Sequence, residues 1–177
     1  KVLTRDISWS DFNAFLLHIF ESRIKSIKPE DIMNQYNNDR LVSLSPVDPR
    51  DLMFVESEIF NILPQNIEPV ELSPVTVMGL SSVISSINPK VVLSTIRKVD
   101  VLADPTSSLA IECAKRRRAI QKIDENDVIH LATSQRILRL QSFPKESGFT
   151  SHFKAFAMAS AGKDIGHQKF ELESMLL

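Results

Sequence analysis

The sequence predicts an α+β fold in which helices flank an antiparallel sheet. A helical N-terminal arm over residues 1–45 precedes the α+β body over residues 46–177. In the arm, apolar residues recur at three- and four-residue steps, the period of an amphipathic helix. After residue 90, β-branched residues and two-residue alternation are typical of strands. Hydrophobic residues make up 43% and charged residues 24% of the chain, which are ordinary globular values.

Charge and composition exclude several classes of protein. The 21 Lys and Arg residues are balanced by 22 Asp and Glu, and the net charge of -1 disfavours a strongly basic nucleic-acid module. Four glycines do not supply a phosphate-binding glycine loop, and one cysteine excludes an internal disulfide or a four-cysteine zinc site. No apolar run approaches the roughly 20 residues of a membrane helix, and no apolar leader follows Lys1. We therefore expect a soluble, cytoplasmic protein with no membrane partner.

The arm contains two predicted helices. Residues 8–26 place their apolar side chains on one face, and Ser8 or Ser10 can cap the start of this helix. Pro29 is expected to open a second, shorter helix over residues 30–36. Asparagines and prolines then predict a polar break and an extended segment.

The next part of the chain alternates helices and short strands. A helix is expected to start at Asp51, because apolar residues line one face up to Leu63 and Pro64 stops it. Residues 75–86 are ambiguous, since they are apolar but contain glycine and serines. Short strands rich in β-branched residues are predicted over Val70–Leu72, Val91–Ile96 and Val99–Leu102.

A further helix and three more strands complete the prediction. The helix is expected to be capped by Thr106 or Ser107 and to run to about Ala119. The strands are predicted over Val128–Thr133, Arg136–Gln141 and His152–Ala159. The remaining elements are a loop over 143–150, a turn over 160–164 and a terminal helix over 170–176.

Four residues on the last two predicted strands form a candidate site. Arg139 and Gln141 share one sheet face at a two-residue period, and His152 and Phe156 also share a face. A guanidinium can bind phosphate bidentately and an aromatic ring can stack on a base, so this layout is suited to a nucleotide lying across the sheet. Spacing alone slightly favours a plainer interpretation, in which Arg139 pairs with a surface acid and Phe156 packs in the core.

Other reactive or charged residues point to structural roles. His130, His152 and His167 lack metal-ligand spacing and no cysteine pair supports them, so no metal site is predicted. Cys113 lies on an apolar helix face and is expected to be a small buried hydrophobe. The cations Lys115–Arg118 complement the dipole at a helix C-terminus, and contact with phosphate or RNA is the alternative.

Three segments occur in an order that resembles the catalytic core of the class II aminoacyl-tRNA synthetases, most nearly the histidyl-type branch with its regulatory paralogues. The helix from Asp51 and the strand ending at Pro74 resemble the family's first motif, which implies a homodimer through residues 51–74. The turn after Leu102 resembles the one that helps to hold the substrate amino acid. This resemblance implies substrate-binding roles for Asp104 and Thr106.

The third segment begins at Ile137, includes a loop, and resembles the family's second motif. The resemblance implies that Arg139 grips the α-phosphate of ATP while an adenylate forms, and that Phe156 stacks on adenine. Gln141 and His152 would position the nucleotide, and Mg²⁺ would bridge its phosphates.

Several positions depart from the family pattern. Asp104 stands where histidyl-type enzymes have Arg, Thr106 stands where they have the acid that holds the substrate amine, and Gln141 and Ala155 replace glutamates. The glycine-rich third motif is not found in these residues. Two functions therefore stay open: an amino-acid-activating or other ligase-type protein that binds ATP or an adenylate, or a non-catalytic regulatory or scaffold paralogue that acts as a dimer. RNA binding through Lys115–Arg118 is a third hypothesis.

Overall fold

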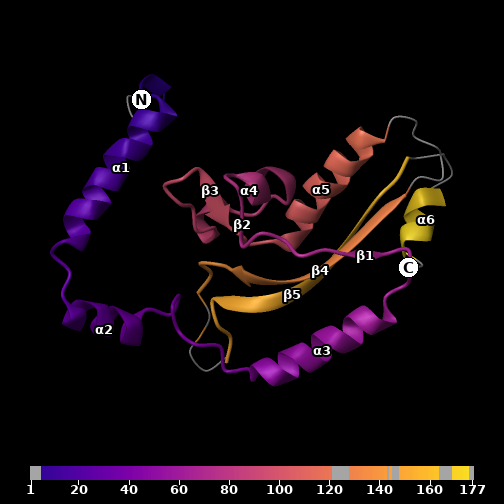
Figure 1. Ribbon diagram of the computed structural model, residues 1–177, viewed down its shortest axis with the longest axis horizontal. Helices are drawn as coiled ribbons and strands as arrows, with labels where there is room; N and C mark the ends of the chain where they lie inside the picture. Colours follow the sequence, from indigo (N-terminus) through magenta and orange to yellow (C-terminus); the bar gives the residue numbers. More distant parts are fainter. Residues whose placement is uncertain (1–4, 121–127, 143, 145–147, 164–168, 176–177) are drawn as a thin grey trace.

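A computed structural model describes residues 5–120, 128–142, 144, 148–163 and 169–175. The helices are α1 (Trp9–Ile24), α2 (Pro29–Asn38), α3 (Pro49–Ile62), α4 (Leu80–Ile84), α5 (Pro105–Ala119) and α6 (Lys169–Met175), with a 3-10 turn at Pro89–Val91. The strands are β1 (Glu68–Pro69), β2 (Val75–Val77), β3 (Val99–Val101), β4 (Ile129–Leu138) and β5 (His152–Ala161). They form one three-stranded sheet in the order β1-β4-β5 and one antiparallel pair of β2 and β3. Helices α5 and α3 lie on either side of the β4–β5 hairpin (Figure 1).

The β4–β5 hairpin sets which side chains share a face. Its strands are antiparallel, with Leu138 opposite His152 and Ser134 opposite Phe156. Residues directly opposite one another point to the same face and successive residues alternate. The odd-numbered residues therefore face α5, and the even-numbered residues face α3. Parallel pairing of β1 with β4 extends the sheet on its other edge.

The core lies between α5 and the hairpin. Leu109 and Cys113 of α5 pack against Leu131 of β4 and Ala157 of β5, and all four are buried. Small alanines on β5 let the helix approach the sheet closely. Burial raises the pKa of the Cys113 thiol. The prediction that Cys113 is a buried hydrophobe is confirmed.

The N-terminal arm is helical, as expected, and stands at one end of the body (Figure 1). Ser8 caps α1 by accepting a hydrogen bond from the backbone N–H of Asp11 at 3.1 Å. No residue of α1 or α2 is buried. Lys98 stacks its ammonium over the Trp9 ring at 5.4 Å, and a cavity of about 280 Å³ separates α1 from residues 94–96.

Helix α3 begins at Pro49, two residues before the predicted start at Asp51. Asp48 caps it, since its carboxylate accepts a hydrogen bond from the N–H of Arg50 at 2.8 Å. The helix ends at Ile62 before Pro64, where the prediction placed its stop.

Two predicted strands are wrong. The pairing expected over Val70–Leu72 falls instead at Glu68–Pro69, because the chain leaves β4 after Val70 donates to the carbonyl of Ala132 at 2.8 Å. Val91–Ile96 is not a strand, because Pro89 opens a 3-10 turn and only Ser94 forms a bridge to β3. The strand expected over Val99–Leu102 is confirmed as β3. The ambiguous segment 75–86 contains β2 and α4, which a glycine at a φ of 82° joins.

Near the C-terminal end, the two strands predicted over 128–133 and 136–141 are one strand, β4. It ends at Leu138, so Arg139 and Gln141 lie beyond it. The strand from His152 is confirmed and extends to Ala161, past the predicted turn at residue 160. Part of the loop 143–150 and His167 lie outside the described residues. No helix in the described part of the chain has the length and apolar character needed to cross a membrane.

A candidate ligand pocket at the loop end of the hairpin

A pocket of about 380 Å³ opens beside the loop end of the β4–β5 hairpin. Three parts of the chain line it: the segment before α3, the strand residues nearest the loop, and the end of the loop itself. The lining residues are Ser45, Pro46, Val47, Leu52, Arg136, Gly148, Phe149, Thr150, Phe153 and Lys154. The linker that follows the arm therefore forms one wall of the pocket.

Two cations from neighbouring strands enter this pocket. Arg136 on β4 stands directly opposite Lys154 on β5. Lys154 donates to the carboxylate of Glu56 on α3 at 2.6 Å, and Ser134 donates to the same oxygen. The hydrogen bond from Lys154, followed by that from Ser134, lowers the pKa of Glu56. Glu56 therefore stays ionised and holds Lys154 toward α3.

His152 orients Arg136. Nε2 of His152 lies 2.7 Å from the carbonyl oxygen of Ser43, and Nδ1 lies 3.0 Å from Nη1 of Arg136. A carbonyl can only accept and a guanidinium can only donate, so Nε2 carries the proton and Nδ1 accepts from Arg136. The ring is thus the neutral Nε2–H tautomer, and it fixes both the linker and the arginine.

Arg40 fastens the same linker to the hairpin loop. Its guanidinium donates to the carbonyls of Leu140 and Gln141 and, at 2.8 Å, to the hydroxyl of Ser151. Three hydrogen bonds from one guanidinium hold both ends of the loop. The segment that leads into the pocket wall at residues 45–47 is therefore anchored at both Arg40 and Ser43.

Two phenylalanine rings line the pocket, Phe149 from the loop and Phe153 from β5, together with the apolar residues Pro46, Val47 and Leu52. The guanidinium carbon of Arg139 lies 5.9 Å from the centre of the Phe153 ring. Nε of Arg139 donates to the carbonyl of Ala103 at 2.8 Å. Arg139 thus supports the Phe153 ring from the side of α5.

The residues predicted for the site are not all brought together. Arg139 contacts Phe153, whose face of the hairpin is opposite to that of His152 and Phe156. Phe156 packs edge-on against Phe60 of α3, with ring centres 6.1 Å apart. Gln141 is exposed. Two of the four predicted residues adjoin the pocket. His152 contacts Arg136, and Arg139 contacts Phe153, and both of these contacted residues line the pocket.

Asp104 and Thr106 lie at the start of α5, where Asp104 rather than Thr106 or Ser107 is the cap. Burial would raise the pKa of Asp104, but hydrogen bonds from Thr106, Ser85 and Ser107 outweigh it and hold the pKa below its usual value. Arg139 donates to the carbonyl of Ala103, the residue before this cap, and so lies near it without contacting the Asp104 carboxylate in the described part of the chain.

Sequence reasoning missed Arg136, Lys154, Arg40 and Phe149. A signal for the first two was present, because a strand that continues to residue 138 puts Arg136 on the face of His152 and Lys154. Splitting that strand in two hid the signal. No local pattern indicates that Arg40, about 100 residues away in sequence, reaches the loop.

The pocket does not fit a metal held by protein ligands. No described residue of its lining is a carboxylate, and Glu56, which binds a cation of the pocket, is paired with Lys154. Among the described residues there is no cluster of His, Cys, Asp and Glu that could hold a metal ion.

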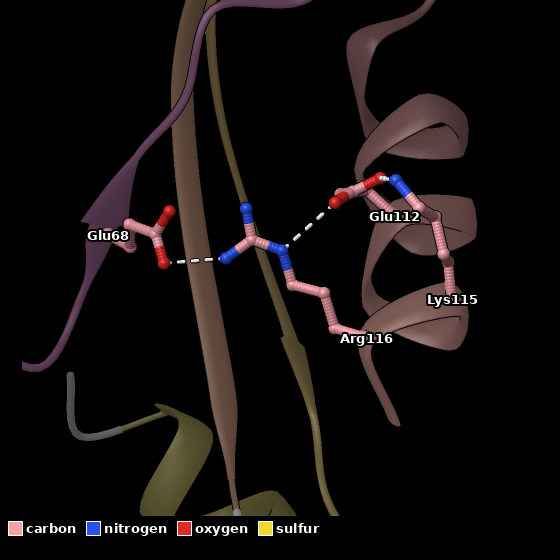
Figure 2. A network of polar contacts seen from close by, with 4 residues as sticks. All are labelled: Glu68, Glu112, Lys115 and Arg116. Carbon is pink, nitrogen blue, oxygen red and sulfur yellow. Dashed lines mark hydrogen bonds and ion pairs between the residues drawn. The ribbon is translucent and has the colours of Figure 1, made fainter. Parts of the chain in front are cut away.

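The cationic run at the end of α5 is partly neutralised (Figure 2). Lys115 and Arg116 both pair with Glu112, at 3.1 and 3.0 Å, and Arg116 also pairs with Glu68 of β1. The hydrogen bond that Arg116 donates to Glu68 is the largest cause that raises the pKa of Arg116. The pair with Glu68 fastens α5 to the sheet and the pairs with Glu112 lie within the helix, which supports a structural role for two of the four cations.

Comparison with known proteins gives no match to any family model and no match among curated proteins. Solved structures do match. One is pyrrolysyl-tRNA synthetase from Desulfitobacterium hafniense, with a TM-score of 0.50 and 12% sequence identity over 83% of this chain and 50% of that chain. A second structure from that organism, PylSc, gives a TM-score of 0.49 and 13% identity over 83% and 48% of the two chains.

A third match is an ATP phosphoribosyltransferase regulatory subunit/histidyl-tRNA synthetase from Bacillus halodurans. Its TM-score is 0.40 and its identity 16%, over 74% of this chain and 29% of that chain. The chain thus spans about half the length of the pyrrolysyl enzyme. Identities this low bear on the fold alone. The chain has the α+β fold of the class II aminoacyl-tRNA synthetase core, which confirms the fold and the resemblance that its sequence predicts.

Proposed function

We propose that this chain binds ATP or an adenylate in the pocket at the loop end of the hairpin. The observation that carries the proposal is the composition of the pocket: Arg136 and Lys154 line the same 380 Å³ space as Phe149 and Phe153. Paired cations suit phosphate groups, and aromatic rings suit a base. The volume lies in the range of about 300–1,000 Å³ that small-molecule sites occupy.

The proposal changes which arginine meets the phosphates. Arg136 shares the pocket with Lys154 and is oriented by His152, whereas Arg139 supports the ring of Phe153. The role inferred for Phe156 passes to Phe149 or Phe153, because Phe156 packs on Phe60 outside the pocket. A magnesium ion that accompanied the nucleotide would take its ligands from phosphate and water, since none of the described residues that line the pocket is a carboxylate.

Isothermal titration of the full chain with ATP, with and without Mg²⁺, tests the proposal. Arg136→Ala and Lys154→Ala should each weaken binding at least tenfold, because each removes one charge-assisted contact. Lys90→Ala, on the 3-10 turn, is the matched control and should bind as the wild type does. No binding by the folded wild type, or equal binding by all three variants, would reject the site.

Nucleotide binding is common to an amino-acid-activating ligase and to a regulatory paralogue. ATP–pyrophosphate exchange separates the two, because only adenylate formation returns labelled pyrophosphate to ATP. Exchange that depends on an added amino acid would establish the ligase. Binding without exchange across all amino acids would favour the regulatory protein.

The exposed side of α3 favours a second candidate function, a dimeric scaffold. Phe54, Val55 and Ile62 point away from the body and are 68%, 51% and 77% exposed. An apolar helix face left in water is typical of an interaction surface. A homodimer through residues 51–74 would cover it. Sedimentation equilibrium of the wild type against Phe54→Asp tests this, and a monomeric wild type at all concentrations would reject it.

A further inference from the structure

The chain exposes far more surface than a compact monomer of its mass. Its accessible surface is 13024 Å², whereas a folded 20.0 kDa monomer is expected to expose about 8,700 Å². Counted over all 177 residues the excess is about 4,300 Å², and one partner in an obligate dimer contributes roughly 1,000–2,500 Å² to the interface. A second copy could therefore bury a complete interface on this surface.

One part of the excess is the apolar side of the arm. Ile32, Met33 and Tyr36 lie within one turn of α2 on a single face, and each is about half or more exposed. Ile24 and Ile27, at the bend between α1 and α2, are also exposed. We refer to these five residues as the arm face.

A second part is the outer side of α3. Leu52, Glu56 and Phe60 point to the pocket and the hairpin. Phe54 lies on the opposite side of the helix, Val55 and Ile62 lie on the flank next to it, and all three are more than half exposed. We refer to these last three residues as the α3 face.

Charges beside the two faces are complementary. Lys25 and Lys28 flank the bend of the arm, next to its isoleucines. Asp51 and Glu58 lie among the exposed apolar residues of α3. Of the two acids at the start of α2, Asp31 lies on the side away from Ile32, Met33 and Tyr36 and accepts from the backbone N–H of Lys28, whereas Glu30 lies three residues before Met33, at the edge of the arm face. The bend of the arm, with Lys25 and Lys28, thus presents cations that are complementary to the anions of the α3 face.

The arm does not reach the α3 face of its own chain. The linker between α2 and α3 spans residues 39–48, and two of its residues are fixed to the hairpin. Arg40 bonds Leu140, Gln141 and Ser151, and the carbonyl of Ser43 accepts from His152. These contacts direct α2 away from α3 (Figure 1). Folding the arm back would break all of them.

We propose that the arm face of one copy docks on the α3 face of a second copy, and that the second copy returns the same contact. This deepens the dimeric scaffold proposed above and rests on it. A two-fold axis makes the exchange reciprocal, so each chain covers both of its exposed faces in one assembly. The partner is therefore a second copy whose arm crosses over, and two α3 helices do not pack on each other.

Cysteine pairing between two populations tests the contact. Met33→Cys, on the arm face, and Val55→Cys, on the α3 face, are purified separately and then mixed under mild oxidation. Cys113 stays in both, because it is buried, and the wild type controls for it. A disulfide-linked dimer should form in the mixture and should be at least tenfold less abundant in either variant alone. A Val55→Cys dimer formed alone would show that α3 meets α3 and would overturn the proposal.

Sedimentation equilibrium gives a second, independent readout. Tyr36→Asp and Ile62→Asp should each raise the dimer dissociation constant at least tenfold, because each buries a carboxylate in the contact. Ile111→Asp, on the exposed side of α5, should not. A dimer that Tyr36→Asp leaves intact would overturn arm docking but keep the α3 scaffold. A monomeric wild type would overturn both, without bearing on nucleotide binding.

Discussion

Nη1 of Arg136 lies 3.0 Å from Nδ1 of His152, and it donates the hydrogen bond between them. The other ring nitrogen of His152 donates to the carbonyl of Ser43 at 2.7 Å. One imidazole therefore couples a pocket cation on β4 to the linker that forms the pocket wall. Its neutral form is required, because a proton on Nδ1 would face the donor of Arg136.

Replacing His152 should weaken nucleotide binding through Arg136. His152→Ala removes the acceptor that orients the guanidinium, and we expect the affinity for ATP to fall about tenfold with a small loss of stability. Titration calorimetry measures the affinity, and thermal unfolding measures the stability. His18→Ala, on the exposed side of α1, is the matched control. An unchanged affinity would mean that Arg136 does not depend on His152.

Comparing Arg136→Ala with Arg139→Ala separates the two arginines. Arg139 donates to the carbonyl of Ala103 and supports Phe153, so its loss should cost about 1 kcal/mol of stability and only a few-fold in affinity. Arg136→Ala should lose at least tenfold in affinity and little stability. The reverse order, with binding abolished only in Arg139→Ala, would restore the assignment made from the synthetase motif.

The sequence could predict the fold class because helical and strand periods differ so clearly along it. The helices α1, α2, α3 and α5 and the strand β5 follow from apolar spacing and from Pro29 and Pro64. Val91–Ile96 is β-branched yet forms no strand, because β3 pairs mainly with β2 and only Ser94 bridges its other side. Strand propensity is decided by the neighbour that a segment pairs with, and that neighbour is not encoded locally.

The candidate site was harder to predict, because its register depends on where β4 ends. The short motif around Arg139 resembles a synthetase motif, but the strand stops at Leu138 and the side chain of Arg139 contacts Phe153. A shift of one residue moves a side chain to the other face of a sheet. Contacts such as Arg40 with Leu140 join distant segments, and spacing within one segment does not reveal them.

Glu56 should act as an internal competitor for the phosphates. Its carboxylate holds Lys154 at 2.6 Å, and its lowered pKa keeps it ionised at neutral pH. Glu56→Gln keeps the shape and removes the charge, so the affinity for ATP should rise about two- to tenfold, the scale of one partly exposed ion pair.

A calorimetric comparison with Glu58→Gln on the same helix checks whether the effect is local. Glu58 faces away from the pocket and should leave the affinity at the wild-type value. A weaker affinity in Glu56→Gln would contradict competition. It would show instead that Glu56 holds Lys154 where the nucleotide needs it.

Asp104 makes part of the stability depend on pH. The pKa of Asp104 is lower in the folded chain than its unfolded value of about 3.9. The ionised carboxylate therefore adds to the free energy of unfolding in full when the pH is well above that unfolded pKa. This contribution is lost as the pH falls through the lower pKa of the folded chain. Asp104→Asn should cost about 1–2 kcal/mol at pH 7, because the cap loses its charged acceptor. Thr106→Val removes one donor to the carboxylate and should cost less. Urea unfolding between pH 7 and pH 3 measures the free energy of unfolding of the wild type and of Asp104→Asn. The difference between these two free energies should become smaller below about pH 5. A gap that stays constant down to pH 3 would mean that the charge on Asp104 does not stabilise the start of α5.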